Sequence, residues 1–121
     1  MAWALAPLLA GEKTVTRRAW TKRYANRFKT NKLLAVYTRR PDWGGKHAAT
    51  IKLTEDPYVE MTDQIPLTDF IAEGFLYMME HGLLVNKKNP LDFWNDWHAD
   101  PKPLYTVRFE LVSLVQDEVG T

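Results

Sequence analysis

The sequence predicts a small α+β protein, or a partly open β-barrel with short helical insertions, folded as one domain over residues 1–121. Segments rich in β-branched and aromatic residues alternate with short segments of helical pattern. No repeat, low-complexity tract or long linker divides the chain. The hydrophobic fraction of 45% and the charged fraction of 26% are typical of a globular protein that buries its own core.

The first half of the chain is expected to begin with a helix and continue in strands. Residues 2–10 form the helix, and Gly11 ends it because glycine tolerates a left-handed conformation. β-Branched residues favour a strand over Thr14–Arg18. Two further strands pair as a hairpin across a segment rich in turn residues. These strands are 33–38 and 47–54, residues 21–29 are a short helix or an irregular basic segment, and 58–61 is a further extended piece.

The second half is expected to contain short helices and one long strand. Thr68 is a candidate N-cap for a helical turn that Gly74 closes, and a helix over 75–81 follows. Asn89 before Pro90 is typical of a helix start, and the tryptophans of that helix, Trp94 and Trp97, are expected in the core. The clearest strand is 104–115, where apolar residues alternate with polar ones.

The net charge of +1 conceals a strong asymmetry along the chain. Residues 1–46 carry eleven Lys or Arg and two acidic residues, whereas residues 47–121 carry five and thirteen. One interpretation is a basic surface for partners that carry phosphate groups. The other is that the two halves pair with each other in the fold, and the sequence leaves both open.

Several classes of site are not expected. The chain has no cysteine, which excludes disulfides, thiolate zinc sites and a cysteine nucleophile, and fits a reducing, cytoplasmic location. No apolar run approaches the roughly 18 residues of a membrane span, and the apolar first ten residues are interpreted as part of the fold. No P-loop or GxGxxG motif occurs, and Asp96-x-His98-x-Asp100 lacks a second histidine nearby. We therefore expect no metal and no cofactor.

The most informative segment is Gly11–Arg18, with the sequence GEKTVTRR. Its hydroxyls and cations, on Thr14, Thr16, Arg17 and Arg18 among others, are the usual donors to phosphate and base oxygens. The same residues would also suit an exposed edge strand that charge protects from pairing.

This segment resembles the GxKxxTxR signature of ASCH domains, which are related to PUA domains, and of short phage and bacterial members in particular. Two other segments fit the family in order and spacing. They are Leu67–Phe75, similar to its central Glu-Gly-aromatic segment, and Tyr105–Leu111, similar to its closing strand. The resemblance implies a PUA-like, partly open β-barrel with short helices at a cleft that binds RNA or a modified nucleobase or nucleoside.

One branch of that family removes the acyl group from N4-acetylcytidine, and its implicated residues correspond to Lys13, Thr16 and Glu73. In that interpretation Thr16 is the nucleophile, Lys13 is its base, and Glu73 either orients Lys13 or exchanges protons with the leaving amine. Because Lys13 and Thr16 are three residues apart, a regular strand would point them to opposite faces, so a turn or bulge after Gly11 is required. The alternative is a structural Lys13–Glu73 ion pair beside a substrate-binding Thr16.

Two other segments are candidates for nucleic-acid binding, because cations neutralise phosphates while exposed aromatic rings stack on bases. The first includes Trp20, Lys22 and Arg23, and the second is a loop with Arg40, Trp43 and Lys46. Phe28 is expected in the core. Binding of RNA or a modified nucleoside is the leading hypothesis; an amidohydrolase, a metal-dependent ribonuclease and a protein-binding regulator of phage origin are the alternatives. The oligomeric state stays open.

Overall fold

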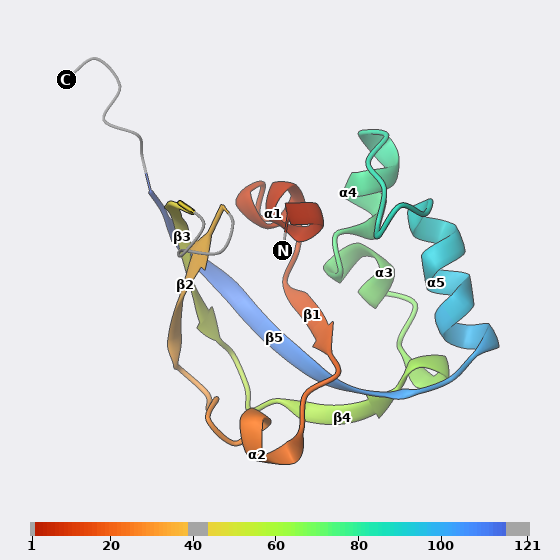
Figure 1. The fold of residues 1–121 in the computed structure, drawn as a ribbon, viewed down its shortest axis with the longest axis horizontal. Coiled ribbons are helices and arrows are strands. Elements are labelled where there is room, and N and C mark those ends of the chain that lie inside the picture. The colour runs from red at the N-terminus through yellow and green to blue at the C-terminus, as the bar shows by residue number, and fades with distance from the viewer. Residues whose placement is uncertain (1, 39–43, 116–121) are drawn as a thin grey trace.

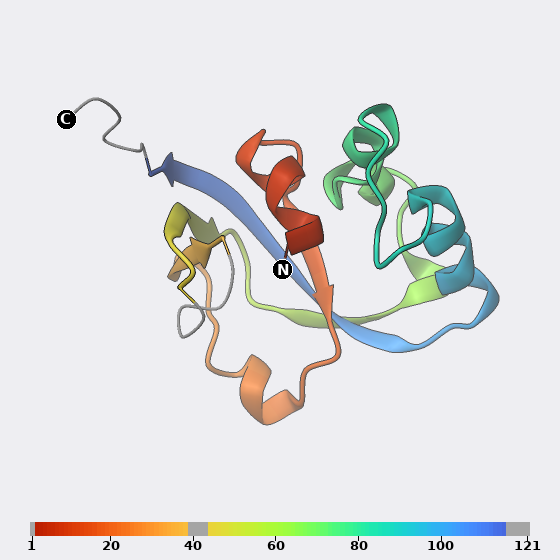
Figure 2. The same ribbon diagram turned by 45° about the horizontal axis from the view of Figure 1, so that its top comes forward.

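The structure, a computed structural model, describes residues 2–38 and 44–115, and places short helices around one antiparallel sheet (Figures 1 and 2). In chain order the elements are α1 (Ala2–Leu9), β1 (Val15–Arg18), α2 (Lys22–Ala25), β2 (Leu33–Tyr37), β3 (His47–Leu53), β4 (Tyr58–Met61), the 3-10 turn η2 (Thr62–Gln64), α3 (Asp69–Ala72), α4 (Phe75–Glu80), α5 (Pro90–Ala99) and β5 (Pro103–Leu114). The α+β class predicted from the sequence is confirmed.

Strand β5 organises the sheet, which has the order β1-β5-β3-β2 with β4 also paired to β5. Its first half pairs with β1 and β4, and its second half pairs with β3, in each case antiparallel. Figure 1 shows β5 running diagonally through the molecule between these partners. Because neighbours cover both edges and both faces of this strand, the successive side chains of Thr106 and Val107 are both buried.

The local signals in the sequence were mostly correct. The hairpin of β2 and β3 is confirmed, and Gly11 follows α1 with a left-handed φ of 75°. Asn89 caps α5 by accepting a hydrogen bond from the N–H of Leu91. Thr68 occupies the expected N-cap position directly before α3, but its backbone is already helical and its side chain makes no capping hydrogen bond.

Two hydrophobic clusters divide the interior. The helical cluster fills the space between α4, α5 and the start of β5, and consists of Ile65, Phe75, Met78, Val85, Trp94, Trp97 and Leu104. The sheet cluster lies on the inner face of β3 and β5 against α1, and consists of Leu8, Ala49, Ile51, Leu53, Val107 and Phe109. Trp94 and Trp97 are therefore core residues, as expected.

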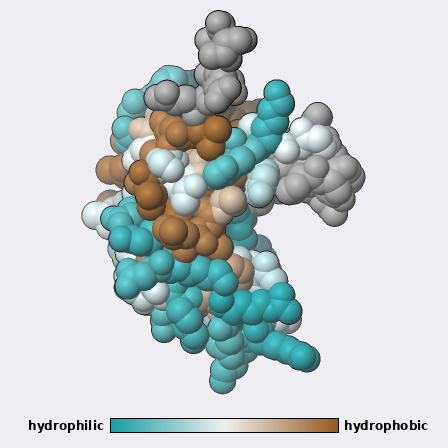
Figure 3. Space-filling view, turned by 90° about the vertical axis from the view of Figure 1, so that its left-hand side faces the viewer, coloured by the Kyte–Doolittle hydropathy of each residue, from teal (hydrophilic) through white to brown (hydrophobic). Residues whose placement is uncertain are grey.

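Some apolar side chains of the sheet remain on the surface. Leu33 and Tyr37 of β2, and Val112 and Leu114 of β5, are exposed. Figure 3 views the molecule from the β2 side and shows a hydrophobic band there, with hydrophilic residues covering one end of this face. Among the described residues, no helix has the length and apolar character needed to cross a membrane.

Candidate functional site

Charged side chains meet where α3 packs against β1. Asp69 begins α3 and Glu73 caps its end, so the two carboxylates lie one helical turn apart on the same face. Both are buried, at 3% and 1% exposure. Together with their partners they form what we call the buried ionic centre, which consists of Lys13, Arg17, Glu60, Asp69, Glu73 and Arg108.

Lys13 reaches Glu73 across 60 positions of sequence. Its ammonium donates to the backbone carbonyl of Glu73 at 2.9 Å and lies 3.4 Å from the carboxylate. The backbone of this segment is fixed at both ends, since the N–H of Lys13 donates to Pro7 and the N–H of Thr14 donates to Ala72. Two of the three residues that the resemblance singled out are thus in direct contact.

The backbone beside Glu73 approaches α1 closely. Gly74 has a φ of 85°, and a Cβ at this position would lie 2.7 Å from the Cβ of Pro7. A side chain there would therefore be strained by conformation and by contact at once. Glycine at position 74 lets the end of α3 come close enough for Glu73 to meet Lys13.

Arg17 occupies the middle of the buried ionic centre. Its guanidinium donates to Glu60 at 2.7 Å, to Asp69, and to Glu73 at 3.4 Å. Arg108 binds Asp69 through two parallel hydrogen bonds of 3.1 and 2.8 Å. Such two-pronged contacts between guanidinium and carboxylate are strong and directional. Arg17 was predicted to bind substrate or nucleic acid. In the structure it forms ion pairs with carboxylates of the protein itself.

Burial changes the chemistry of Lys13. Removal from water lowers the pKa of the Lys13 ammonium below its usual value, and the neighbouring cations Arg18 and Arg17 act in the same direction. The Glu73 carboxylate opposes this effect without cancelling it. The amine of Lys13 therefore releases its proton more readily than an exposed lysine does.

Thr16 lies in β1 next to Arg17, and its hydroxyl is buried. Within the described part of the chain this Oγ1 has no hydrogen-bond partner, so it is bonded neither to Lys13 nor to Glu73. Lys13 precedes the first residue of β1, and the alternation of the strand does not apply to it. The structure thus supplies the irregular backbone after Gly11, yet leaves the Thr16 hydroxyl without a partner.

The segment that follows β1 carries positive charge that is exposed to solvent instead of buried. We call residues 22–32 the basic segment, and its exposed cations are Lys22, Arg23, Arg27, Lys29 and Lys32. Among the described residues, none of these five has a carboxylate within ion-pair distance.

Three aromatic rings pack beneath the basic segment. Trp20 stacks on Phe28 with 4.7 Å between ring centroids, and Tyr24 meets both rings edge-on. Trp20 and Phe28 are partly buried against the sheet cluster, which agrees with the core position expected for Phe28, whereas Tyr24 is 41% exposed. Arg27 and Lys32 lie over the rings of Tyr24 and Phe28, each at 5.4 Å.

The other predicted residues are dispersed. Thr14 and Lys46 are exposed, and Arg18 is half-buried with a pKa that burial lowers. Arg40 and Trp43 lie outside the described residues. In residues 2–38 and 44–115, no group of three metal-binding side chains comes together.

Sequence reasoning missed Asp69 and Glu60, two acidic partners of Arg17, and it missed Arg108, which pairs with Asp69. Asp69 was considered only as part of a helix start, although its spacing of four from Glu73 was a usable signal. Glu60 and Arg108 come from β4 and β5, and only the pairing of those two strands brings them to the site. No pattern along the chain indicates that pairing.

Comparison with known proteins does not assign the chain. No family model matches it, and neither a curated protein nor a solved structure is significantly similar to it. The resemblance to ASCH domains therefore rests on the motifs of the sequence alone.

Proposed function

We propose that this protein is an ASCH-type, PUA-like domain that binds single-stranded RNA or a modified nucleobase or nucleoside. The observation that carries the proposal is the basic segment, whose cations are exposed and have no carboxylate of the described chain within ion-pair distance. These side chains are available to phosphate oxygens without the loss of an internal ion pair. Tyr24 adds an exposed ring on which a base can stack.

Binding of a fluorescently labelled single-stranded RNA, followed by anisotropy at several salt concentrations, tests this proposal. If three to five phosphates are neutralised, the logarithm of the affinity should fall with the logarithm of the salt concentration with a slope of about −2 to −3.5. The variant Lys22→Gln/Arg23→Gln/Arg27→Gln should bind at least about tenfold more weakly at low salt, with a flatter slope.

Lys52→Gln is the matched control, because Lys52 is a surface lysine already paired with Glu110. Its affinity should stay close to that of the unmodified protein. Equal losses in the control and the triple variant, or an affinity that does not depend on salt, would argue against a specific role of the basic segment.

A second candidate function is hydrolysis of an N4-acylated cytidine, which the ASCH resemblance implies. The contact between Lys13 and Glu73 and the lowered pKa of Lys13 support it, and the Thr16 hydroxyl, which makes no hydrogen bond in the described structure, would have to bond to Lys13 when substrate binds. A neutral Lys13 amine would accept the proton of Thr16 as its oxygen attacks the acyl carbon, and Glu73 would hold the amine in place. The C–N bond would then break, the N4 amine would leave with the proton that Lys13 took up, and water would release the acyl group from Thr16 as a carboxylic acid.

Thr16 permits a test that does not break the buried ionic centre. Thr16→Val keeps the volume and removes a hydroxyl that has no partner, so the free energy of unfolding should change by less than about 1 kcal/mol. Release of cytidine from N4-acetylcytidine, measured by chromatography, should disappear in Thr16→Val and persist in Thr16→Ser. Turnover by Thr16→Val would exclude Thr16 as the nucleophile. Absence of turnover by the unmodified protein would exclude the hydrolase function.

A further inference from the structure

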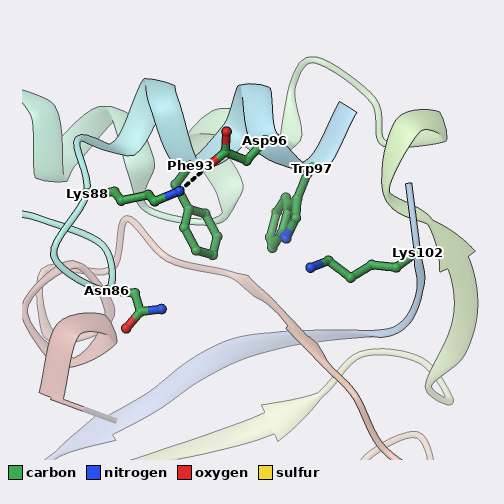
Figure 4. A pocket seen from close by; sticks show the side chains of 6 residues that line it. All are labelled: Asn86, Lys88, Phe93, Asp96, Trp97 and Lys102. Carbon is green, nitrogen blue, oxygen red and sulfur yellow. Dashed lines mark hydrogen bonds and ion pairs between the residues drawn. The ribbon is translucent and has the colours of Figure 1, made fainter. Parts of the chain in front are cut away.

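A pocket lies on the helical side of the molecule, apart from both the buried ionic centre and the basic segment. It is bounded by α5, by the turn that precedes α5, and by the segment that leads into β5 (Figure 4). The residues that line it are Asn86, Lys88, Phe93, Asp96, Trp97 and Lys102. Its volume is about 160 Å³, room for about five waters at ~30 Å³ each.

Backbone hydrogen bonds hold two sides of this pocket in place. Val85 and Lys88 exchange hydrogen bonds of 2.8 and 2.9 Å, and the residues between them both have positive φ, at 48° and 68°. This is a tight two-residue turn, and it fixes Asn86 at one side. On the other side the N–H of Lys102 donates to the hydroxyl of Thr62 at 3.1 Å.

The polar groups of the pocket are mostly donors. Lys88 is paired with Asp96, the one acidic residue of the lining. Within the described residues, the Lys102 ammonium has no carboxylate partner and the indole N–H of Trp97 makes no hydrogen bond. Figure 4 shows the indole nitrogen on the side of the ring that faces the Lys102 ammonium. Two donors without a partner in the described residues therefore lie on the same side of the pocket, an arrangement that suits an oxyanion.

The remaining walls are aromatic. Phe93 and Trp97 project from α5 one turn apart, with 5.1 Å between ring centroids and an angle of 62° between the ring planes. A planar ring can pack against them by edge or face. The volume is below the range of about 300–1,000 Å³ that is usual for drug-sized ligands, so the pocket has room for a single ring.

We propose that this pocket binds a small aromatic carboxylate. The ring of the ligand lies against Phe93 and Trp97, and its carboxylate accepts hydrogen bonds from the Lys102 ammonium and the Trp97 indole N–H. The site is independent of the RNA-binding and hydrolase proposals, because it shares no residue with either.

A titration followed by nitrogen-15 NMR tests the site with benzoate as the probe. The indole resonance of Trp97, assigned by its loss in Trp97→Phe, should shift progressively with benzoate. Benzamide, acetate and inorganic phosphate should each bind at least about threefold more weakly, because each lacks either the charge or the ring. An equal response to benzamide or to phosphate overturns the proposal, and so does a Trp97 resonance that benzoate leaves unmoved.

Two lysines give matched variants. Lys102→Gln should weaken benzoate binding by about two- to fivefold, the range of one solvent-exposed charge pair. Lys87→Gln removes an exposed lysine of the neighbouring turn that does not line the pocket, and it should leave the affinity unchanged. Equal effects of the two substitutions would mean that only the overall charge matters, and would overturn the site.

Discussion

The buried ionic centre and the basic segment hold positive charge in opposite ways. Arg17 and Lys13 are almost completely buried, and carboxylates from β4 and α3 surround them. A few residues further along the chain, Lys22, Arg23 and Arg27 stand in solvent without a carboxylate partner in the described structure. The basic first third of the sequence therefore divides into two groups of cations. Its buried cations pair with carboxylates of the second half of the chain, as one interpretation predicted, whereas binding of phosphate groups by the exposed cations stays a prediction.

The difference has an energetic basis. An ion loses its hydration when it is buried, and only close partners with good geometry compensate for that loss. Cations on the surface stay hydrated and interact weakly with their neighbours. The buried cations therefore cannot bind another molecule without the loss of their internal ion pairs. The exposed cations of the basic segment have no such pair to lose among the described residues.

The largest effect is expected from Glu73→Gln. This substitution removes a negative charge that both Lys13 and Arg17 contact, and it leaves two buried cations undercompensated. The free energy of unfolding, measured in urea, should fall by about 3–5 kcal/mol. Glu110→Gln is the control, because its ion pair with Lys52 is exposed and should contribute less than about 1 kcal/mol. Similar losses in both variants would mean that burial does not distinguish these charges.

Acidic pH is expected to lower the stability of the fold by an intermediate amount. Burial alone would raise the pKa of Asp69, but hydrogen bonds from Arg108 and Arg17 outweigh it and hold that pKa below its ordinary value. The unfolded chain then binds a proton more readily than the folded one, so this stabilisation is complete above the ordinary pKa of about 3.9 and is lost as the pH falls through the folded value. Thermal unfolding from pH 6 to pH 2 should show this decline.

Asp69→Asn should flatten that decline and lower the stability at pH 6. Asp56→Asn is the matched comparison, because hydrogen bonds from Thr30 lower the pKa of Asp56 as well, but on the surface. If Asp56→Asn flattens the curve as much as Asp69→Asn does, the acid sensitivity does not originate in the buried ionic centre.

The sequence predicted the elements better than the contacts between them. Local rules identified α5 from Asn89 and Pro90, and the β2–β3 hairpin from its strands and turn. The convergence of Lys13 and Glu73 could be predicted because the resemblance to the ASCH signature linked two distant segments. Arg17, by contrast, carries the same side chain as its exposed neighbours, and only the tertiary packing of α3 and β4 decides that it is buried. The alternation of β1 puts Arg17 on the same face as the buried Val15, but it does not indicate which carboxylates compensate the buried charge.

The smallest effect on stability is expected in the basic segment. Lys22→Gln and Arg23→Gln should each change the free energy of unfolding by less than about 0.5 kcal/mol, because neither side chain has an ion-pair partner among the described residues. Arg27→Gln should lower it by up to about 1 kcal/mol, since the guanidinium lies over the exposed ring of Tyr24. Relief of repulsion between like charges offsets part of that loss in the triple variant. A loss above about 2 kcal/mol in urea unfolding would show that these cations support the fold, and weaker RNA binding by that variant would then say nothing about phosphate contacts.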